Sequence, residues 1–177
     1  MAYAAFRLGW YPAAIVNGEF VGTSLFQKEL AAAFQYQAAA VSKEERKKIQ
    51  DQEFINVLRA QVLDDLIEKK IITQALHALV GGERAGGLLD SKIASLSVSK
   101  RTDLKEAVFK LYGLDWEEFQ ELVVIPQAER DILKEELYAR DGAKDFDEYL
   151  RAERKDARVH VFSDYLYWDG GKIQKKK

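Results

Sequence analysis

Cysteine is absent from this chain of 177 residues, only two histidines are present, and no long uninterrupted apolar run occurs. Without cysteine the chain has no disulfides, no thiolate metal ligands and no cysteine nucleophile, although this absence does not fix the compartment. A bilayer span needs about 18 apolar residues in a row, so no segment of this sequence spans a membrane as it stands. Charge of one sign is lacking too, because 27 Lys and Arg stand against 29 Asp and Glu. Nucleic acid is therefore not expected as a partner.

The groups that catalysis or metal binding would need are sparse. His77 falls near the apolar end of an expected helix, and His160 alternates with valines in an expected strand. We interpret both as structural or surface residues, since companion groups are missing and their spacing cannot make a metal site. The paired carboxylates Asp64-Asp65 and Glu117-Glu118 point about 100° apart on a helix, so neither pair is an acid/base couple. We expect no enzyme activity, and no catalytic, metal-binding or cofactor-binding residue.

What the sequence does contain is a hairpin signal close to its start. Ala14-Ile15-Val16 and Glu19-Phe20-Val21 are joined by Asn17-Gly18, a pair that accepts positive φ at both positions and predicts a two-residue turn. Residues 1–13 precede the hairpin as an apolar and aromatic arm, too short for a membrane span and without the layout of a cleavable signal. Two interpretations of this arm stay open. Either it packs on the body, or its aromatic residues flank a membrane anchor that lies upstream of Met1.

Most of the remaining chain has helical periodicity. Ser24 caps a predicted helix that runs to about Ala40. Ser42 and Glu45 have capping-box spacing, and no glycine or proline follows until Gly81, so the next predicted helix exceeds thirty residues. At about 1.5 Å per residue that helix is roughly 50 Å long, and its apolar stripe widens along its length. We expect it to protrude or to bridge two lobes.

Shorter helices follow, each marked by local start and stop signals. Paired glycines at 81–82 and 86–87 end the long helix and weaken the next segment, which leaves a short helix over residues 88–96. Three further helices are predicted: one from Thr102 to Tyr112 closed by Gly113, one from Asp115 to Asp141-Gly142, and one from Phe146 to about Lys155. Pro126 interrupts the second of them, either as a kink or in the first turn of a new helix.

The chain ends as it begins, with strand-forming residues. Val159–Val161 alternates with a histidine at its centre, and Tyr165–Trp168 is rich in aromatic residues that favour strands. A lone two-stranded hairpin is marginally stable. We therefore expect strands from residues 15–21 to lie beside residues 159–168, which would bring the two termini together.

Together these elements predict a mainly α fold with one very long helix and a small β element, formed by the N-terminal hairpin and the C-terminal strands. Three segments are expected: the arm at residues 1–13, one helical domain at residues 14–170, and a solvated basic tail at residues 171–177. A hairpin that leads directly into a helical body is an unusual order of elements. It is the main indication of function in this sequence.

Four stretches of the chain carry a resemblance to a known family. Ala14-Ile15-Val16-Asn17-Gly18-Glu19 stands before a helix, and Val62–Ala75 lies within the long helix. These stretches resemble the N-terminal chaperone domain of the SurA and PrsA type of extracytoplasmic folding factors. Leu111–Phe119 is similar to a helix start of that domain, with Tyr-Gly followed by acidic residues and phenylalanine, and Arg151–Trp168 resembles its closing segment. The resemblance covers most of the chain through loose patterns of apolar positions.

The resemblance implies an ATP-independent holdase chaperone whose partners are unfolded or partly folded polypeptides. It also implies a location outside the cytoplasm, in a periplasm or at a cell surface, with a membrane tether in the full-length protein. The relatives carry a parvulin-type prolyl isomerase domain of about a hundred residues, the size of a typical domain. This sequence leaves no room for such a domain, so isomerase activity is not expected.

Seven aromatic residues on expected helices are candidate client contacts, because binding surfaces favour aromatic side chains. They are Phe34, Tyr36, Tyr112, Trp116, Phe119, Tyr138 and Tyr149. The alternative for each of them is ordinary core packing, which is the usual role of aromatic residues at helical spacing. A second hypothesis for the whole chain is a non-enzymatic structural or adaptor module that binds one folded partner or forms a homo-oligomer. A third is a degenerate prolyl isomerase.

Overall fold

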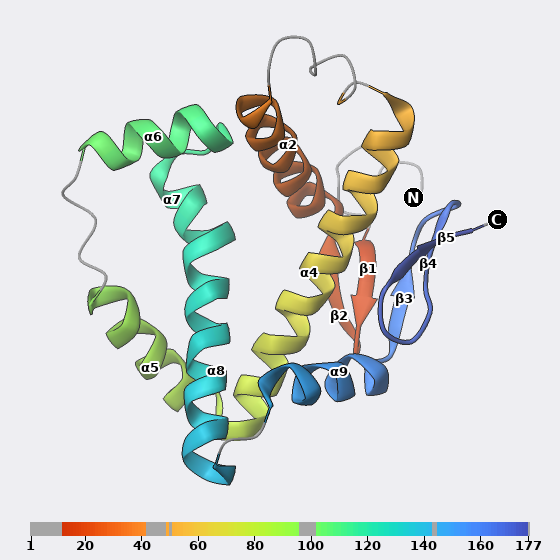
Figure 1. The fold of residues 1–177 in the computed structure, drawn as a ribbon. Helices are drawn as coiled ribbons and strands as arrows, with labels where there is room; N and C mark the ends of the chain where they lie inside the picture. The colour runs from red at the N-terminus through yellow and green to blue at the C-terminus, as the bar shows by residue number, and fades with distance from the viewer. Residues whose placement is uncertain (1–11, 42–48, 50, 96–101, 143–144, 177) are drawn as a thin grey trace, which may run out of the picture. The chain divides into compact units, whose positions relative to one another are not determined.

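The computed structural model describes residues 12–41, 49, 51–95, 102–142 and 145–176 (Figure 1). Its fold is mainly helical with a small antiparallel sheet, which confirms the fold class predicted from the sequence. The chain forms two compact units. Unit 1 holds the chain up to Ile67, Lys110–Gly113 and the chain from Ala157 onward. Unit 2 holds Glu68–Phe109 and Leu114–Asp156.

Unit 1 begins with the predicted hairpin. Strands β1 (Pro12–Val16) and β2 (Glu19–Gly22) pair antiparallel. Asn17 and Gly18 between them have φ values of 52° and 92°, and two consecutive positive values are what a type I′ turn requires. Only glycine, asparagine and aspartate enter this region at low cost, so the local sequence determines the turn.

The third strand of this sheet comes from the other end of the chain. Strand β3 (Val159–Val161) pairs antiparallel with β1, which gives the order β2-β1-β3. Asn17 of the turn makes two hydrogen bonds with Arg158, the residue before β3. Its N–H donates to the Arg158 carbonyl at 2.9 Å, and its Oδ1 accepts from the Arg158 N–H at 2.8 Å. The predicted contact between the hairpin and the C-terminal strands is confirmed for β3. Strand β4 (Leu166–Trp168) pairs instead with β5 (Ile173–Lys175).

The turn between β4 and β5 explains this difference. Asp169 Oδ1 accepts from the N–H groups of Gly171 and Lys172 at 3.0 and 2.9 Å, which reverses the chain within a few residues. The Lys172 N–H, more than the other donors, holds the pKa of Asp169 below its ordinary value. Beyond the turn, the Ile173 N–H donates to Asp64 Oδ1 of the long helix at 2.8 Å. Part of the expected basic tail is thus an ordered strand.

Helix α2 (Thr23–Ala40) follows β2 directly, as predicted. The core of unit 1 combines one face of the sheet with the long helix. Its buried members include Ala14, Val16, Val21, Ile49, Leu58, Val62, Leu63, Leu66, Ile67 and Leu166. Helix α2 adds only Ala32 to the buried set, although it is 18 residues long.

The long helix α4 (Gln52–Val80) has 29 residues and begins later than the sequence suggested. The chain bends at Asp51, whose Oδ1 accepts from the Glu53 N–H at 3.4 Å, and the helix starts after it. The capping box predicted at Ser42–Glu45 lies outside the described residues. At about 1.5 Å per residue α4 is roughly 44 Å long. It ends at Gly81, which has a φ of 84°, as the glycine predicted.

Unit 2 contains the C-terminal part of α4 and further helices. They are α5 (Gly82–Ser95), α6 (Thr102–Tyr112), α7 (Trp116–Phe119), the π-helix η2 (Gln120–Val124), α8 (Ile125–Asp141) and α9 (Phe146–Asp156). The last turn of α6 belongs to unit 1. The starts and stops predicted at residues 102, 113, 115, 142 and 146 agree with these bounds to within one residue.

The short helix predicted over residues 88–96 is wrong, because α5 starts immediately after Gly81 and continues through Gly86 and Gly87. Contacts with α8 offset the weak helix propensity of these glycines. Arg84 donates to both carboxylate oxygens of Glu136 at 2.9 Å, and Lys92 Nζ donates to Glu135 Oε1 at 2.6 Å. Ala85, the residue that follows Arg84, is buried.

Pro126 lies in the first turn of α8, as one of the two predicted alternatives had it, and α7, η2 and α8 follow one another without a gap. The Ile125 N–H donates to the Gln120 carbonyl five residues earlier, which widens the helix into a π turn just before the proline. Pro126 has no N–H for the carbonyl of Leu122, four residues before it. That carbonyl accepts from Lys69 Nζ at 3.0 Å instead. A side chain from α4 thus replaces the missing backbone donor.

Candidate functional site

Both histidines lie at the surface. His77 is exposed in the last turn of α4, and His160 is exposed in β3, with its ring edge-on to Phe162 at a centroid distance of 4.7 Å. In the part of the chain that the structure describes, no three acidic or histidine side chains gather as a metal site would require. The predicted contact residues are aromatic, and they lie in both units.

In unit 1 the structure brings together two predicted contact residues, Tyr36 of α2 and Tyr112 of α6. Their rings stack at a centroid distance of 5.1 Å, and Tyr36 remains 43% exposed. Burial, with a smaller contribution from Tyr36, raises the pKa of Tyr112. Gln35 Nε2 donates to the Lys110 carbonyl at 3.3 Å beside the stack. Gly113 has a φ of 69°, which favours glycine, and a Cβ at this position would also displace the flexible end of the Gln35 side chain.

The surrounding surface of α2 is apolar and incompletely buried. Lys28 and Glu29 are the charged residues of this helix. Phe34, a third predicted contact, is half-buried, and Leu25 is 37% exposed. A helix this apolar is usually enclosed by other elements. Here its large apolar side chains stay partly accessible, and the stacked tyrosines lie near its C-terminal end.

Unit 2 holds the other four predicted contacts. Trp116 and Phe119 lie in α7 with ring centroids 5.9 Å apart, and both are half-buried. The predicted capping box fixes this pair, since Asp115 Oδ1 accepts from the Glu118 N–H at 2.8 Å while Glu118 Oε2 accepts from the Asp115 N–H at 3.1 Å. The capping box therefore holds the first turn of α7, which carries both aromatic residues.

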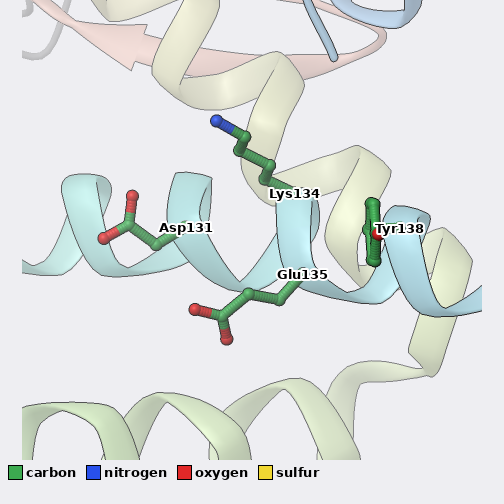
Figure 2. A pocket seen from close by; sticks show the side chains of 4 residues that line it. All are labelled: Asp131, Lys134, Glu135 and Tyr138. Atoms are coloured by element: carbon green, nitrogen blue, oxygen red, sulfur yellow. The ribbon is translucent and has the colours of Figure 1, made fainter. Parts of the chain in front are cut away.

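Tyr138 is the most exposed of the predicted contacts, at 66%. It lines a cavity of 520 Å³ together with Asp131, Lys134 and Glu135 of the same helix, α8. Figure 2 shows Glu135 directed from α8 toward α5, where Lys92 meets it. The cavity combines one aromatic ring with a charged rim.

Tyr149 differs from Tyr138, because it is half-buried on α9. Burial, followed by the charge of Glu153 and a hydrogen bond with it, raises the pKa of Tyr149 to about 12. This environment is that of a packing residue. Among the seven candidates, Tyr36 and Tyr138 are thus exposed, and the others are half-buried.

Several exposed aromatic residues were not predicted as contacts, among them Phe20, Phe109 and Phe162. Phe20 of β2 is 67% exposed and Phe109 of α6 is 62% exposed. Phe162, after β3, lines a cleft of 280 Å³ in unit 1 together with Phe26 and Leu63. Strand alternation could have indicated Phe20, since its neighbour Val21 faces the core.

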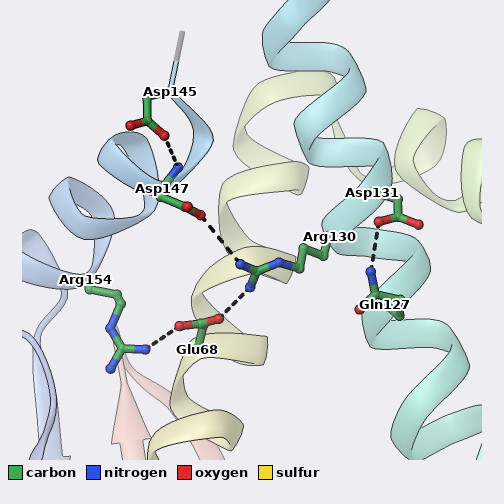
Figure 3. Close-up of polar contacts among 7 residues, drawn as sticks. All are labelled: Glu68, Gln127, Arg130, Asp131, Asp145, Asp147 and Arg154. Carbon is green, nitrogen blue, oxygen red and sulfur yellow. Dashed lines mark hydrogen bonds and ion pairs between the residues drawn. The ribbon is translucent and has the colours of Figure 1, made fainter.

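A charged cluster in unit 2 joins three helices (Figure 3). Glu68 of α4 bonds Arg130 Nη1 of α8 through Oε1 and Arg154 Nη1 of α9 through Oε2, each at 2.5 Å. Arg130 also lies over the ring of Phe146 at 5.1 Å and 3.9 Å from an Asp147 carboxylate oxygen. Arg154 is only 8% exposed. Because its cations are satisfied by the carboxylate between them, we interpret this cluster as a structural clamp of unit 2.

No helix in the described ranges is long and apolar enough to cross a membrane. Comparisons of the chain with protein-family models, with curated proteins and with solved structures gave no match.

Proposed function

We propose that this protein is an ATP-independent holdase chaperone, which binds unfolded or partly folded polypeptides on apolar helical surfaces. The observation that carries the proposal is the state of α2, an 18-residue apolar helix with a single buried residue. Large exposed apolar patches on a folded protein commonly mark interaction sites. An unfolded client offers the complementary surface, since it exposes apolar side chains that a native protein buries.

The remaining features fit a surface that binds clients weakly and releases them. Leu25 and Tyr36 are each less than half exposed, so a client gains only part of the free energy of full burial at each position. Scattered weak contacts also tolerate many client sequences. Such binding needs no nucleotide to reverse it.

The resemblance to the SurA and PrsA type of chaperone domain supports the same proposal from the sequence side. It extends the proposal to a location outside the cytoplasm and to a membrane tether in the full-length protein. We propose that the helical region holds clients without isomerising their prolyl bonds. A prolyl-peptide isomerisation assay with clear turnover would contradict this last part.

The test is suppression of the aggregation of an unfolded client at stoichiometric amounts of the protein. The double variant Leu25→Gln with Tyr36→Gln removes apolar surface from α2 and keeps a good helix former at both positions. We expect it to need several-fold more protein for the same suppression. The matched control, Leu25→Met with Tyr36→Phe, keeps the apolar area and should act like the unchanged protein. Equal activity of the two variants would show that α2 is not the client surface.

The exposed surface of α2 also favours a second function, in which a copy of the same chain or one folded partner covers this helix. Sedimentation equilibrium distinguishes the two functions. A dimer that the glutamine variant dissociates and the methionine-phenylalanine variant preserves would favour the self-associating or adaptor module over the holdase.

A further inference from the structure

Strand β2 lies at one end of the sheet order β2-β1-β3. In the described part of the chain, no strand pairs with its outer edge. A strand edge carries main-chain N–H and C=O groups that another extended chain can complete. The question is which groups of β2 point outward.

The register of the sheet answers it. Val16 and Glu19 flank the two-residue turn directly, so they exchange hydrogen bonds with each other, and the next pair along does not. That next pair is Ile15 with Phe20. In antiparallel strands such pairs alternate, so the N–H and C=O of Phe20 point away from β1.

The other side of β1 confirms this alternation independently. The Asn17 N–H donates to the Arg158 carbonyl at 2.9 Å, and the Phe162 N–H donates to the Ala13 carbonyl at 3.0 Å. Odd-numbered residues of β1 therefore bond toward β3, which leaves the even-numbered ones for β2. The main-chain groups of Phe20 belong to the outer edge.

The side chain of Phe20 adds an apolar contact at the same place. It is 67% exposed, whereas the adjacent Val21 is 2% exposed on the opposite face. Ile15, its cross-strand neighbour on the same face, is half-buried. An extended chain beside β2 would thus find hydrogen-bonding groups at the edge and an apolar face next to it.

We infer that the outer edge of β2 binds an extended segment of an unfolded polypeptide as a fourth strand, an inference that rests on the proposed function. The occupant must be extended, must carry N–H groups along one edge, and must place an apolar side chain beside Phe20. Because β2 has four residues, few hydrogen bonds form. Binding is therefore weak and reversible, as exchange between clients requires.

The probe is a nine-residue peptide of alternating threonine and valine, added to the full chain. Amide hydrogen exchange, read residue by residue by NMR, reports on the edge directly. Without peptide the Phe20 N–H should exchange quickly, while those of Glu19 and Val21 are slowed by their bonds to β1. At a peptide concentration ten times its Kd, exchange of the Phe20 N–H should slow about tenfold, with little change at its two neighbours.

Two controls separate strand addition from simple apolar contact. The same peptide methylated on every backbone nitrogen keeps its side chains but lacks N–H donors, so it should leave exchange at Phe20 unchanged. In the protein, Phe20→Ser keeps the strand edge and should weaken peptide binding roughly three- to tenfold through the lost apolar contact. Tyr167→Ser, at a 42% exposed aromatic residue of β4, should not weaken it.

Three results would overturn the inference. Peptide binding measured by fluorescence anisotropy without slowed exchange at Phe20 would place the peptide elsewhere, and the holdase proposal would stand on its own aggregation assay. Slow exchange at Phe20 that depends on protein concentration alone would assign the edge to a second copy of this chain. Absence of both peptide binding and aggregation suppression would remove the proposed function together with this inference.

Discussion

Replacing Glu68 by glutamine tests how unit 2 is held together. Its carboxylate lies between Arg130 and Arg154, at 2.5 Å from each guanidinium. Glutamine keeps nearly the same shape but carries no charge, so Glu68→Gln removes the only carboxylate that bridges the two cations in Figure 3. The perturbation is electrostatic, and it leaves the packing volume almost unchanged.

The burial of each partner sets the magnitude. Removing one partner of a fully buried ion pair costs about 3–5 kcal/mol. Arg154 is 8% exposed, but the side chains of Glu68 and Arg130 are 24% and 33% exposed, so water screens part of the loss. We expect Glu68→Gln to lower the free energy of unfolding by about 2–3 kcal/mol.

Arg130→Gln should cost less, because the pair of Glu68 with Arg154 survives. Its partly exposed ion pair and its contact with the ring of Phe146 contribute together about 1–2 kcal/mol. The matched control is Arg84→Gln, which removes a guanidinium whose side chain is 61% exposed. That change should cost at most about 1 kcal/mol.

The assay is urea unfolding at neutral pH, followed by far-ultraviolet circular dichroism. The expected order of destabilisation is Glu68→Gln, then Arg130→Gln, then Arg84→Gln. If Glu68→Gln costs no more than Arg84→Gln, the cluster does not clamp the helices of unit 2. The buried guanidinium of Arg154 would then not need the Glu68 carboxylate for the stability of the fold.

Three further predictions concern single positions. Lys69→Met removes the donor to the Leu122 carbonyl and should cost about 1–2 kcal/mol in urea unfolding, unless another donor reaches that oxygen. Gly113→Ala puts a residue with a Cβ at a φ of 69° and should cost about 1–2 kcal/mol in urea unfolding, so a neutral result would contradict strain at this backbone conformation. The raised pKa of Tyr149 contributes stability that is complete below pH 10 and is lost as pH rises toward about 12. Tyr149→Phe should therefore flatten the decline of the urea midpoint across this window, and an unchanged slope would refute the shift.

For the candidate site, the sequence could supply residue types but not their exposure. Periodicity placed Tyr138 and Tyr149 on helices, and it did not distinguish which of them could contact a client. One is 66% exposed and the other is half-buried, because exposure depends on which neighbouring helix covers each face. Strand alternation alone places Phe20 on the face opposite Val21, but only the sheet order shows that β2 lies at an edge.

By itself the sequence determined the features that local chemistry controls. Asn17-Gly18 fixed the turn because few other residues accept positive φ, and Asp115 fixed a helix start because its side chain accepts from the Glu118 N–H in the first turn. Tertiary contacts decided the rest. Helix α5 runs through Gly86-Gly87 because ion pairs hold it to α8, and the helix continues past Pro126 because a lysine from α4 satisfies the carbonyl that the proline cannot. These partners lie some 40 to 60 residues away in the sequence, beyond the reach of any local pattern.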